Sequence, residues 1–163
     1  MITVRRMEER DAGTAARLEA ENFSMPWSEH AFLETLRCGY ACYYVAETDE
    51  EGRDGKVIGI CGLRNLAGEG EITNVVVAES CRRMGAAGLM LERVLAEGTE
   101  LGIESFTLEV RCSNRAAIGL YEKFGFRSEG VRRNFYEKPR EDALIMWKRK
   151  AAASAGQERT GAK

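Results

Sequence analysis

The sequence predicts one domain of the α/β class, in which a mixed β-sheet of about six to seven strands is flanked by about four helices. The chain has 163 residues, the size of one domain. Seven short segments have the composition or alternation of strands, and four longer ones have apolar residues at helical spacing. Their order is strand, two helices, three strands, helix, strand, helix and two strands, which differs from a regular doubly wound fold.

The elements follow from local patterns. Alternating apolar residues predict the first strand, and Asp11 and Ser28 are placed to cap the next two helices. Trp27 and Phe32 stand at the two positions of a hydrophobic staple at the start of the second helix. Gly102 is a stop for the third helix. We expect strands at residues 2–6, 42–48, 56–63, 71–77, 105–112, 126–132 and 143–148, and helices at residues 11–23, 28–38, 84–101 and 114–124.

Two segments are expected to lie outside these elements. Residues 49–55 are polar and glycine-bearing, and they predict a hairpin loop between two strands. Residues 149–163 contain no large apolar residue, and we expect a disordered tail after a domain at residues 1–148.

The charge is close to balanced, with 24 Lys and Arg against 26 Asp and Glu. The residues up to Lys148 carry 20 basic and 25 acidic side chains, since the tail has four basic residues and one Glu. This acidic body disfavours nucleic acid as a partner and suits a cationic substrate. No stretch reaches the ~18 apolar residues of a membrane span, and the start lacks a signal-peptide core. We therefore expect a cytosolic protein with no membrane partner.

The five cysteines are odd in number and scattered, without a C-x-x-C pair. The single histidine, His30, cannot complete a zinc site with them, so no metal is expected. The composition favours reduced thiols in or near the core.

The segment at residues 75–88 runs from an apolar strand into a helix start. A helix start leaves N–H groups unpaired and carries partial positive charge, which suits a pyrophosphate. The small residues at 85–88 allow close approach to the backbone, and Arg82 and Arg83 add full charges. The segment matches neither a P-loop nor a dinucleotide fingerprint. An ordinary helix start with solvated arginines is the alternative interpretation.

Two residues are candidates for acid–base chemistry. Glu109 shares a strand face with Thr107 and Arg111, and a carboxylate there can accept a proton from an amine. Tyr121 lies on the apolar stripe of the last helix, and a phenol stays protonated at neutral pH and can donate to a thiolate. The alternatives are an exposed Glu109 paired with Arg111, and a core tyrosine.

Two motifs carry a family resemblance. Residues 82–87 fit the pattern R-x-x-G-x-A, and residues 114–126 fit N-x-x-A-x-x-L-Y-x-x-x-G-F. In this order they resemble the acetyl-CoA motifs of the GNAT superfamily of N-acetyltransferases. The stretches at residues 108–114 and 120–126 are similar to the ribosomal-protein alanine N-acetyltransferase branch, and those at residues 26–29, 132–136 and 141–146 agree with it; the resemblance covers residues 1–148.

The resemblance implies the GNAT fold, acetyl-CoA as co-substrate, Glu109 as base and Tyr121 as acid. The main chain of residues 75–77 would hold the pantetheine arm and thioester carbonyl, and the helix start would hold the pyrophosphate. The implied cofactor-binding residues are Val75, Val76, Val77, Arg82, Arg83, Met84, Gly85, Ala86, Ala87, Gly88 and Asn114. The implied acceptor-binding residues are Arg132, Asn134 and Tyr136. The chain departs from the branch at Arg82, Met84, Ala86 and the pair Ala78-Glu79.

The branch substrate would be the N-terminal alanine of small-subunit ribosomal protein number eighteen, a basic protein. Three alternatives stay open: a broader N-terminal or small-amine acetyltransferase, a non-catalytic acyl-CoA-binding module, and a covalent route through Cys112. The thiol route has no recognisable triad partner, since His30 is distant in sequence.

Overall fold

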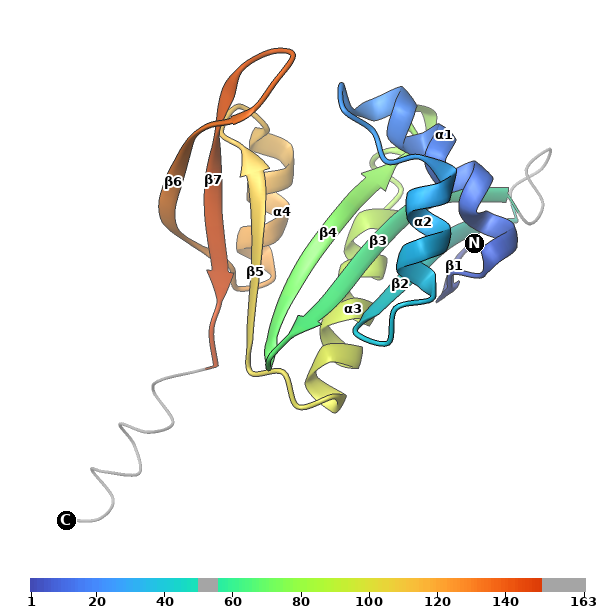
Figure 1. Ribbon diagram of the computed structural model, residues 1–163, viewed down its shortest axis with the longest axis horizontal. Helices are drawn as coiled ribbons and strands as arrows, with labels where there is room; N and C mark the ends of the chain where they lie inside the picture. Colours follow the sequence, from blue (N-terminus) through green and yellow to red (C-terminus); the bar gives the residue numbers. More distant parts are fainter. Residues whose placement is uncertain (50–55, 151–163) are drawn as a thin grey trace.

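A computed structural model describes residues 1–49 and 56–150, which form one seven-stranded mixed sheet with helices on both faces (Figure 1). The sheet order is β1-β2-β3-β4-β5-β7-β6. The strands are β1 (Ile2–Arg6), β2 (Ala41–Thr48), β3 (Lys56–Leu66), β4 (Glu69–Val77), β5 (Ser105–Arg111), β6 (Arg127–Tyr136) and β7 (Glu141–Lys148). The helices are α1 (Ala12–Asn22), α2 (Glu29–Leu36), α3 (Ala86–Glu100) and α4 (Arg115–Lys123), with short 3₁₀ turns at Glu9–Asp11 and Glu79–Cys81.

The sheet is divided between β4 and β5, its one parallel neighbour pair in the described residues. These strands pair over only three residues each, at residues 69–71 and 105–107. Beyond Thr107, β5 continues in antiparallel register with β7 as far as Arg111. Figure 1 shows β4 and β5 close together at one end and well apart at the other. The sheet therefore opens as a fork in its middle.

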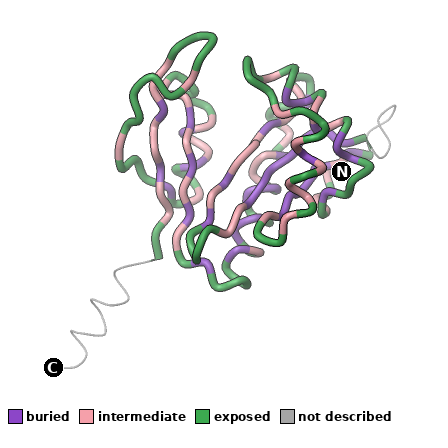
Figure 2. Tube along the Cα trace, viewed as in Figure 1, coloured by how far each residue is buried: buried purple, intermediate pink, exposed green. Residues whose placement is uncertain are grey.

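Each face of the sheet has its own core. The alternation of β2 shows this, because Tyr44 packs in the cluster with α3 and α4, whereas Tyr43 packs in the cluster with α1 and α2. The central strands are the most buried part of the molecule (Figure 2). Alternate side chains of the sheet thus pack against α1 and α2 on one face and against α3 and α4 on the other.

The predicted fold class is confirmed, with seven strands and four helices in the expected order. The Ser28 cap is confirmed, since its Oγ accepts the Ala31 N–H at 3.1 Å, and the Trp27 and Phe32 rings lie 5.3 Å apart. Asp11 precedes α1 but caps it with no hydrogen bond. Its carboxylate accepts instead from the guanidinium of Arg5, at 2.8 and 2.9 Å.

Several boundaries differ from the expected ones, and three of them have a clear physical reason. The third helix begins at Ala86 rather than Met84, because Gly85 has φ +88° and therefore lies outside the right-handed helical region. β3 extends to Leu66, and β6 runs through Tyr136, since pairing with the neighbouring strand carries each past its apolar run. Residues 50–55 of the expected loop and residues 151–163 of the expected tail lie outside the described residues.

Two described residues of the expected tail make contacts with the domain. Arg149 pairs with Glu129 at 2.7 Å and lies over the ring of Trp147 at 4.2 Å. Lys150 pairs with Glu104 at 3.3 Å. Among the described helices, none combines the length and apolar character needed to cross a membrane.

Two helical glycines make opposite predictions for stability. A methyl group on Gly98 in α3 would lie 2.5 Å from the buried ring of Phe106, whereas one on Gly119 in α4 would meet nothing within 4 Å. Alanine is better than glycine in a helix interior by about 1 kcal/mol. We expect Gly119→Ala to raise the free energy of unfolding by about 0.5–1 kcal/mol. Gly98→Ala should lower it, since overpacking a core costs about 1–3 kcal/mol.

Urea denaturation followed by circular dichroism measures both changes. Gly119→Ala is the matched control for the gain in helix propensity. A Gly98→Ala protein as stable as wild type would contradict the tight packing around Phe106.

Candidate active site

A groove of about 560 Å³ lies where β4 and β5 separate. Its lining includes residues 71–75 of β4, residues 108–111 of β5, residues 22–25 at and after the end of α1, and residues 135–139 at the end of β6 and in the β6–β7 turn. The last two meet, because Ser24 Oγ donates to the Glu137 carbonyl at 2.9 Å. The groove is thus bounded by backbone that belongs to both halves of the sheet.

Glu109 lies on the groove side of β5, on the half-buried face predicted for it. Its Oε2 is buried and has no hydrogen bond, the one such side-chain atom among the described residues. Arg132 Nη1 lies 3.0 Å from this oxygen as an ion pair, but without the geometry of a hydrogen bond. Burial raises the pKa of the Glu109 carboxyl, while Arg132 lowers it and Glu71 raises it further. The predicted alternative partner is wrong, since Arg111 pairs with Glu141 at 3.2 Å.

Tyr121 lines the same groove from α4. Its side chain is 6% exposed and packs edge-on against Phe126, with ring centroids 6.0 Å apart. No hydrogen bond to its hydroxyl is found in the described part of the chain. Burial raises the pKa of this hydroxyl well above its ordinary value, so it is protonated at neutral pH.

β4 carries a bulge beside the groove. Asn74 and Val75 stand opposite the single residue Cys61, between the pairs formed by Ile60 with Val76 and Gly62 with Thr73. Asn74 has φ +54°, in the left-handed region that asparagine tolerates better than most residues. The bulge redirects the main chain of β4 at the place where no β5 partner is present.

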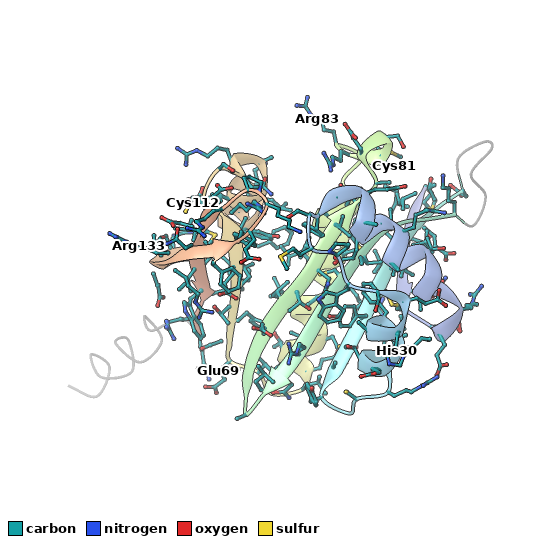
Figure 3. The ribbon with its side chains drawn as sticks, turned by 45° about the horizontal axis from the view of Figure 1, so that its top comes forward. His30, Glu69, Cys81, Arg83, Cys112 and Arg133 are labelled. Carbon is teal, nitrogen blue, oxygen red and sulfur yellow. The ribbon has the colours of Figure 1, made fainter. Side chains whose placement is uncertain are left out.

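The segment before α3 forms a turn suited to an anion. Arg83 and Gly85 both have positive φ, at 68° and 88°. The first helical hydrogen bond is from Leu89 N–H to Gly85, so the N–H groups of residues 86–88 have no acceptor inside the helix. Arg82 donates to Asn22 at the end of α1. Arg83 projects outward from this turn (Figure 3).

The remaining predicted residues divide between the groove and its surroundings. Asn114 lines the groove, and its Oδ1 caps α4 by accepting the Ala117 N–H at 3.2 Å. Tyr136 lines it too, with Arg111 4.5 Å above its ring. Burial and the nearby Glu109 carboxylate raise the pKa of Tyr136 to about 12. Asn134 lies outside the lining, where its N–H donates to Asp142 at 2.9 Å.

The structure therefore brings together only part of the predicted set. Within the groove it places Val75, Glu109, Asn114, Tyr121 and Tyr136. The predicted cofactor residues from Val76 to Gly88 and the predicted acceptor residues Arg132 and Asn134 are not among the groove-lining residues. The turn at residues 82–88 follows the end of β4 after a short 3₁₀ turn.

Sequence reasoning missed Glu19, a groove residue on α1 that is 2% exposed. Burial raises the pKa of its carboxyl, against the opposing effect of two N–H donors. A signal was present, because Glu19 follows Ala12, Ala15 and Leu18 along the apolar face of the helix. A charged residue on such a face is unusual enough to mark a buried polar contact.

The cysteines and the histidine do not form a catalytic pair. Cys42, Cys61 and Cys81 are buried, as expected, and Cys38 and Cys112 are half-buried. Cys112 is not a groove-lining residue. His30 lies on α2, on the opposite side of the molecule from Cys112 (Figure 3), and pairs with Glu34.

Similarity to known proteins agrees with this geometry. The model of the acetyltransferase (GNAT) family matches residues 13–126. A Bacillus subtilis (strain 168) protein, provisionally named a ribosomal protein bS18-alanine N-acetyltransferase, is 35% identical over 145 residues, which cover 88% of this chain and 93% of that protein. The ribosomal protein bS18-alanine N-acetyltransferase of Escherichia coli (strain K12) is 32% identical over 148 residues, covering 90% of this chain and 96% of that protein.

A solved structure extends the agreement to three dimensions. The crystal structure of the ribosomal-protein-S18-alanine N-acetyltransferase from Escherichia coli superposes with a TM-score of 0.82 at 30% identity, covering 93% of this chain and 96% of that chain. The family match includes β4, β5, α3 and α4, which carry the fork, the groove and the turn before α3. The chain belongs to the acetyltransferase (GNAT) family and is an acetyl-CoA-dependent N-acetyltransferase.

Proposed function

We propose that this enzyme transfers acetyl from acetyl-CoA to the N-terminal amine of a protein, and that its acceptor is the N-terminal alanine of ribosomal protein bS18. The observation that carries the mechanism is the buried, hydrogen-bond-free oxygen of Glu109, in a groove that it shares with the Tyr121 hydroxyl. The identity to two proteins with this named substrate supports the acceptor. We propose that the enzyme acts in the cytoplasm and that residues 1–148 form its catalytic domain.

The cofactor fits the side of the fork formed by β4 and α3. The diphosphate would be held by the free N–H groups at residues 86–88, where the positive end of the helix favours an anion. Arg82, Arg83, Met84 and Gly85 form the turn around it. The main chain of residues 75–77 would hold the pantetheine arm and the thioester carbonyl, since the β5-facing edge of β4 is unpaired there. Asn114 caps α4 through Oδ1, which leaves its amide nitrogen for the cofactor.

Glu109 would act as the general base. An α-ammonium has a pKa of about 8 and is not nucleophilic until it loses a proton. The Glu109 carboxylate lines the groove and makes no hydrogen bond with the described residues, so it can accept this proton, directly or through a water, as the amine attacks the thioester carbon. The raised pKa of the Glu109 carboxyl is closer to the pKa of the amine, which makes Glu109 a better base than an exposed glutamate.

Tyr121 would act as the general acid. The bond between carbonyl carbon and sulfur breaks after attack, and the departing thiolate takes a proton from the phenol. The Tyr121 side chain is 6% exposed, and its hydroxyl has no competing hydrogen bond in the described part of the chain, so it is available for this donation. Tyr121 on α4 and Glu109 on β5 line the same groove.

The acceptor would enter between the segment after α1 and the β6–β7 turn. Tyr136 lines this end, and Arg132 and Asn134 belong to the strand that leads into the turn. The excess of acidic residues up to Lys148 complements a basic ribosomal protein. A broader N-terminal or small-amine acetyltransferase would use the same acid and base with a different set of contacts at this end.

An acceptor panel tests the substrate. The protein is incubated with acetyl-CoA and either a polyamine or peptides that carry the bS18 N-terminal sequence with Ala, Ser, Met or acetylated Ala at the first position. Mass spectrometry should show one added acetyl group, with the Ala peptide the preferred acceptor and the blocked peptide inert. Equal use of every free N-terminus would support the broader enzyme, and modification of polyamines instead would contradict the protein acceptor.

Substitution of the acid and the base tests the mechanism. We expect Glu109→Gln and Tyr121→Phe each to lower kcat by about 10²–10⁴-fold, the usual contribution of general acid–base catalysis. The Kd of CoA should change little. Glu129→Gln, an exposed carboxylate paired with Arg149, is the matched control and should keep wild-type kcat. Wild-type turnover by either groove variant would remove that residue from the mechanism.

The pH profile tests the electrostatic environment of the base. Only the deprotonated Glu109 carboxyl accepts a proton, so kcat/KM falls as the pH falls through its pKa. Arg132→Ala removes the cation that lowers this pKa, and the acidic break of the profile should move to higher pH. Arg133→Ala is the control, since Arg133 projects outward from β6 (Figure 3). An unmoved break in Arg132→Ala would show that the ion pair does not act on the base.

A further inference from the structure

Glu19 is the buried carboxylate of the groove that the proposed mechanism does not use. Both of its oxygens have structural partners. Oε1 accepts the main-chain N–H of Trp27 at 3.0 Å, and Oε2 accepts the side-chain amide of Asn74 at 3.2 Å. Glu109, in contrast, keeps an oxygen free of hydrogen bonds. Glu19 and Glu109 are therefore equipped for different tasks.

The contacts of Glu19 join the two walls of the groove. Trp27 ends the segment that follows α1, which borders the entry side. Asn74 is the left-handed residue of the β4 bulge, on the side where the main chain would meet the thioester carbonyl. Asn74 is itself held, because its Oδ1 accepts from the Tyr43 hydroxyl at 2.6 Å, and the same hydroxyl lies 2.8 Å from Thr73 Oγ1.

Burial gives these contacts their strength. Glu19 and Tyr43 are 2% and 1% exposed, so a lost partner would leave a buried polar group unsatisfied. The Trp27 ring adds an apolar contact to the same unit, at 6.1 Å from the Tyr43 ring. The connection from Trp27 through Glu19 and Asn74 to Tyr43 is therefore a continuous link, in which Glu19 and Tyr43 are buried and Trp27 and Asn74 are half-buried.

We propose that Glu19 and Asn74 form a positioning pair that fixes the acceptor-side segment at residues 23–27 relative to the β4 bulge. The pair would set the distance between the incoming amine and the thioester carbonyl without touching either. This inference rests on the proposed function, since it assigns the two walls to acceptor and thioester. Neither residue is a catalytic residue in this scheme.

Trp27 reports the link without any acceptor. In a Trp147→Phe background, Trp27 is the single tryptophan of the chain. We expect Glu19→Gln and Asn74→Gly to raise the acrylamide quenching constant of Trp27 at least about twofold. The glutamine amide offers one carbonyl oxygen in place of two acceptors, and glycine at position 74 adopts positive φ freely but has no side-chain amide. The control Glu21→Gln, on the exposed side of α1, should leave quenching unchanged.

Kinetics separates positioning from folding. With the acceptor that wild type acetylates, both variants should lose at least about tenfold in kcat, while the Kd of CoA stays within about threefold. The double variant should lose no more than the more impaired single variant, because both act on one link. Thermal melts confirm that each variant is folded at the assay temperature.

Other outcomes overturn the proposal. Unchanged quenching in both variants would show that the pair does not hold the segment. A kcat within about twofold of wild type would show that the link does not position the reactants. If Asn74→Gly alone behaves as wild type, the backbone conformation at position 74 matters and the hydrogen bond from the Asn74 amide to Glu19 does not. Failure of wild type on the bS18 peptide overturns the acceptor only, since the quenching result stands independently of it.

Discussion

The short parallel contact between β4 and β5 is the constraint on which the rest of the molecule depends. Three residues of each strand pair, and then β5 follows β7 while β4 bends away at its bulge. Backbone N–H and C=O groups on facing strand edges normally satisfy one another, so their separation leaves a polar cleft inside an otherwise continuous sheet. A substrate with amide groups and a carbonyl can bind there as a substitute for the missing strand contacts.

The groove illustrates how one type of side chain takes two roles through its surroundings. Glu19 and Glu109 are both carboxylates with raised pKa values, and burial is the main cause for each. Two N–H donors occupy the oxygens of Glu19, whereas Glu109 faces a cation and keeps an oxygen open. A general base needs a lone pair that is not held in a hydrogen bond, whereas a structural carboxylate needs its lone pairs hydrogen-bonded. The difference between the two lies in their neighbours and not in their residue type.

Much of this architecture could be predicted from local patterns. Periodicity located every strand and helix, and alternation placed Glu109 on the correct face of β5. The family resemblance, rather than periodicity, singled out Glu109 and Tyr121 among ordinary alternatives. Non-local features could not be predicted, because the pairing of β5 with β7 and the bulge at Asn74 depend on strands distant in sequence. The alternative prediction that Glu109 pairs with Arg111 was wrong for the same reason, since its partner Arg132 comes from β6.

The apex of the fork is packed around one aromatic ring. Phe106 belongs to the middle pair of the parallel contact and packs against Gly70 of β4 and Gly98 of α3. Glu109 lies three residues farther along β5, about 10 Å away at the rise of a strand. The placement of Glu109 relative to β4 therefore depends on packing around Phe106, a buried residue that is not among the groove-lining residues.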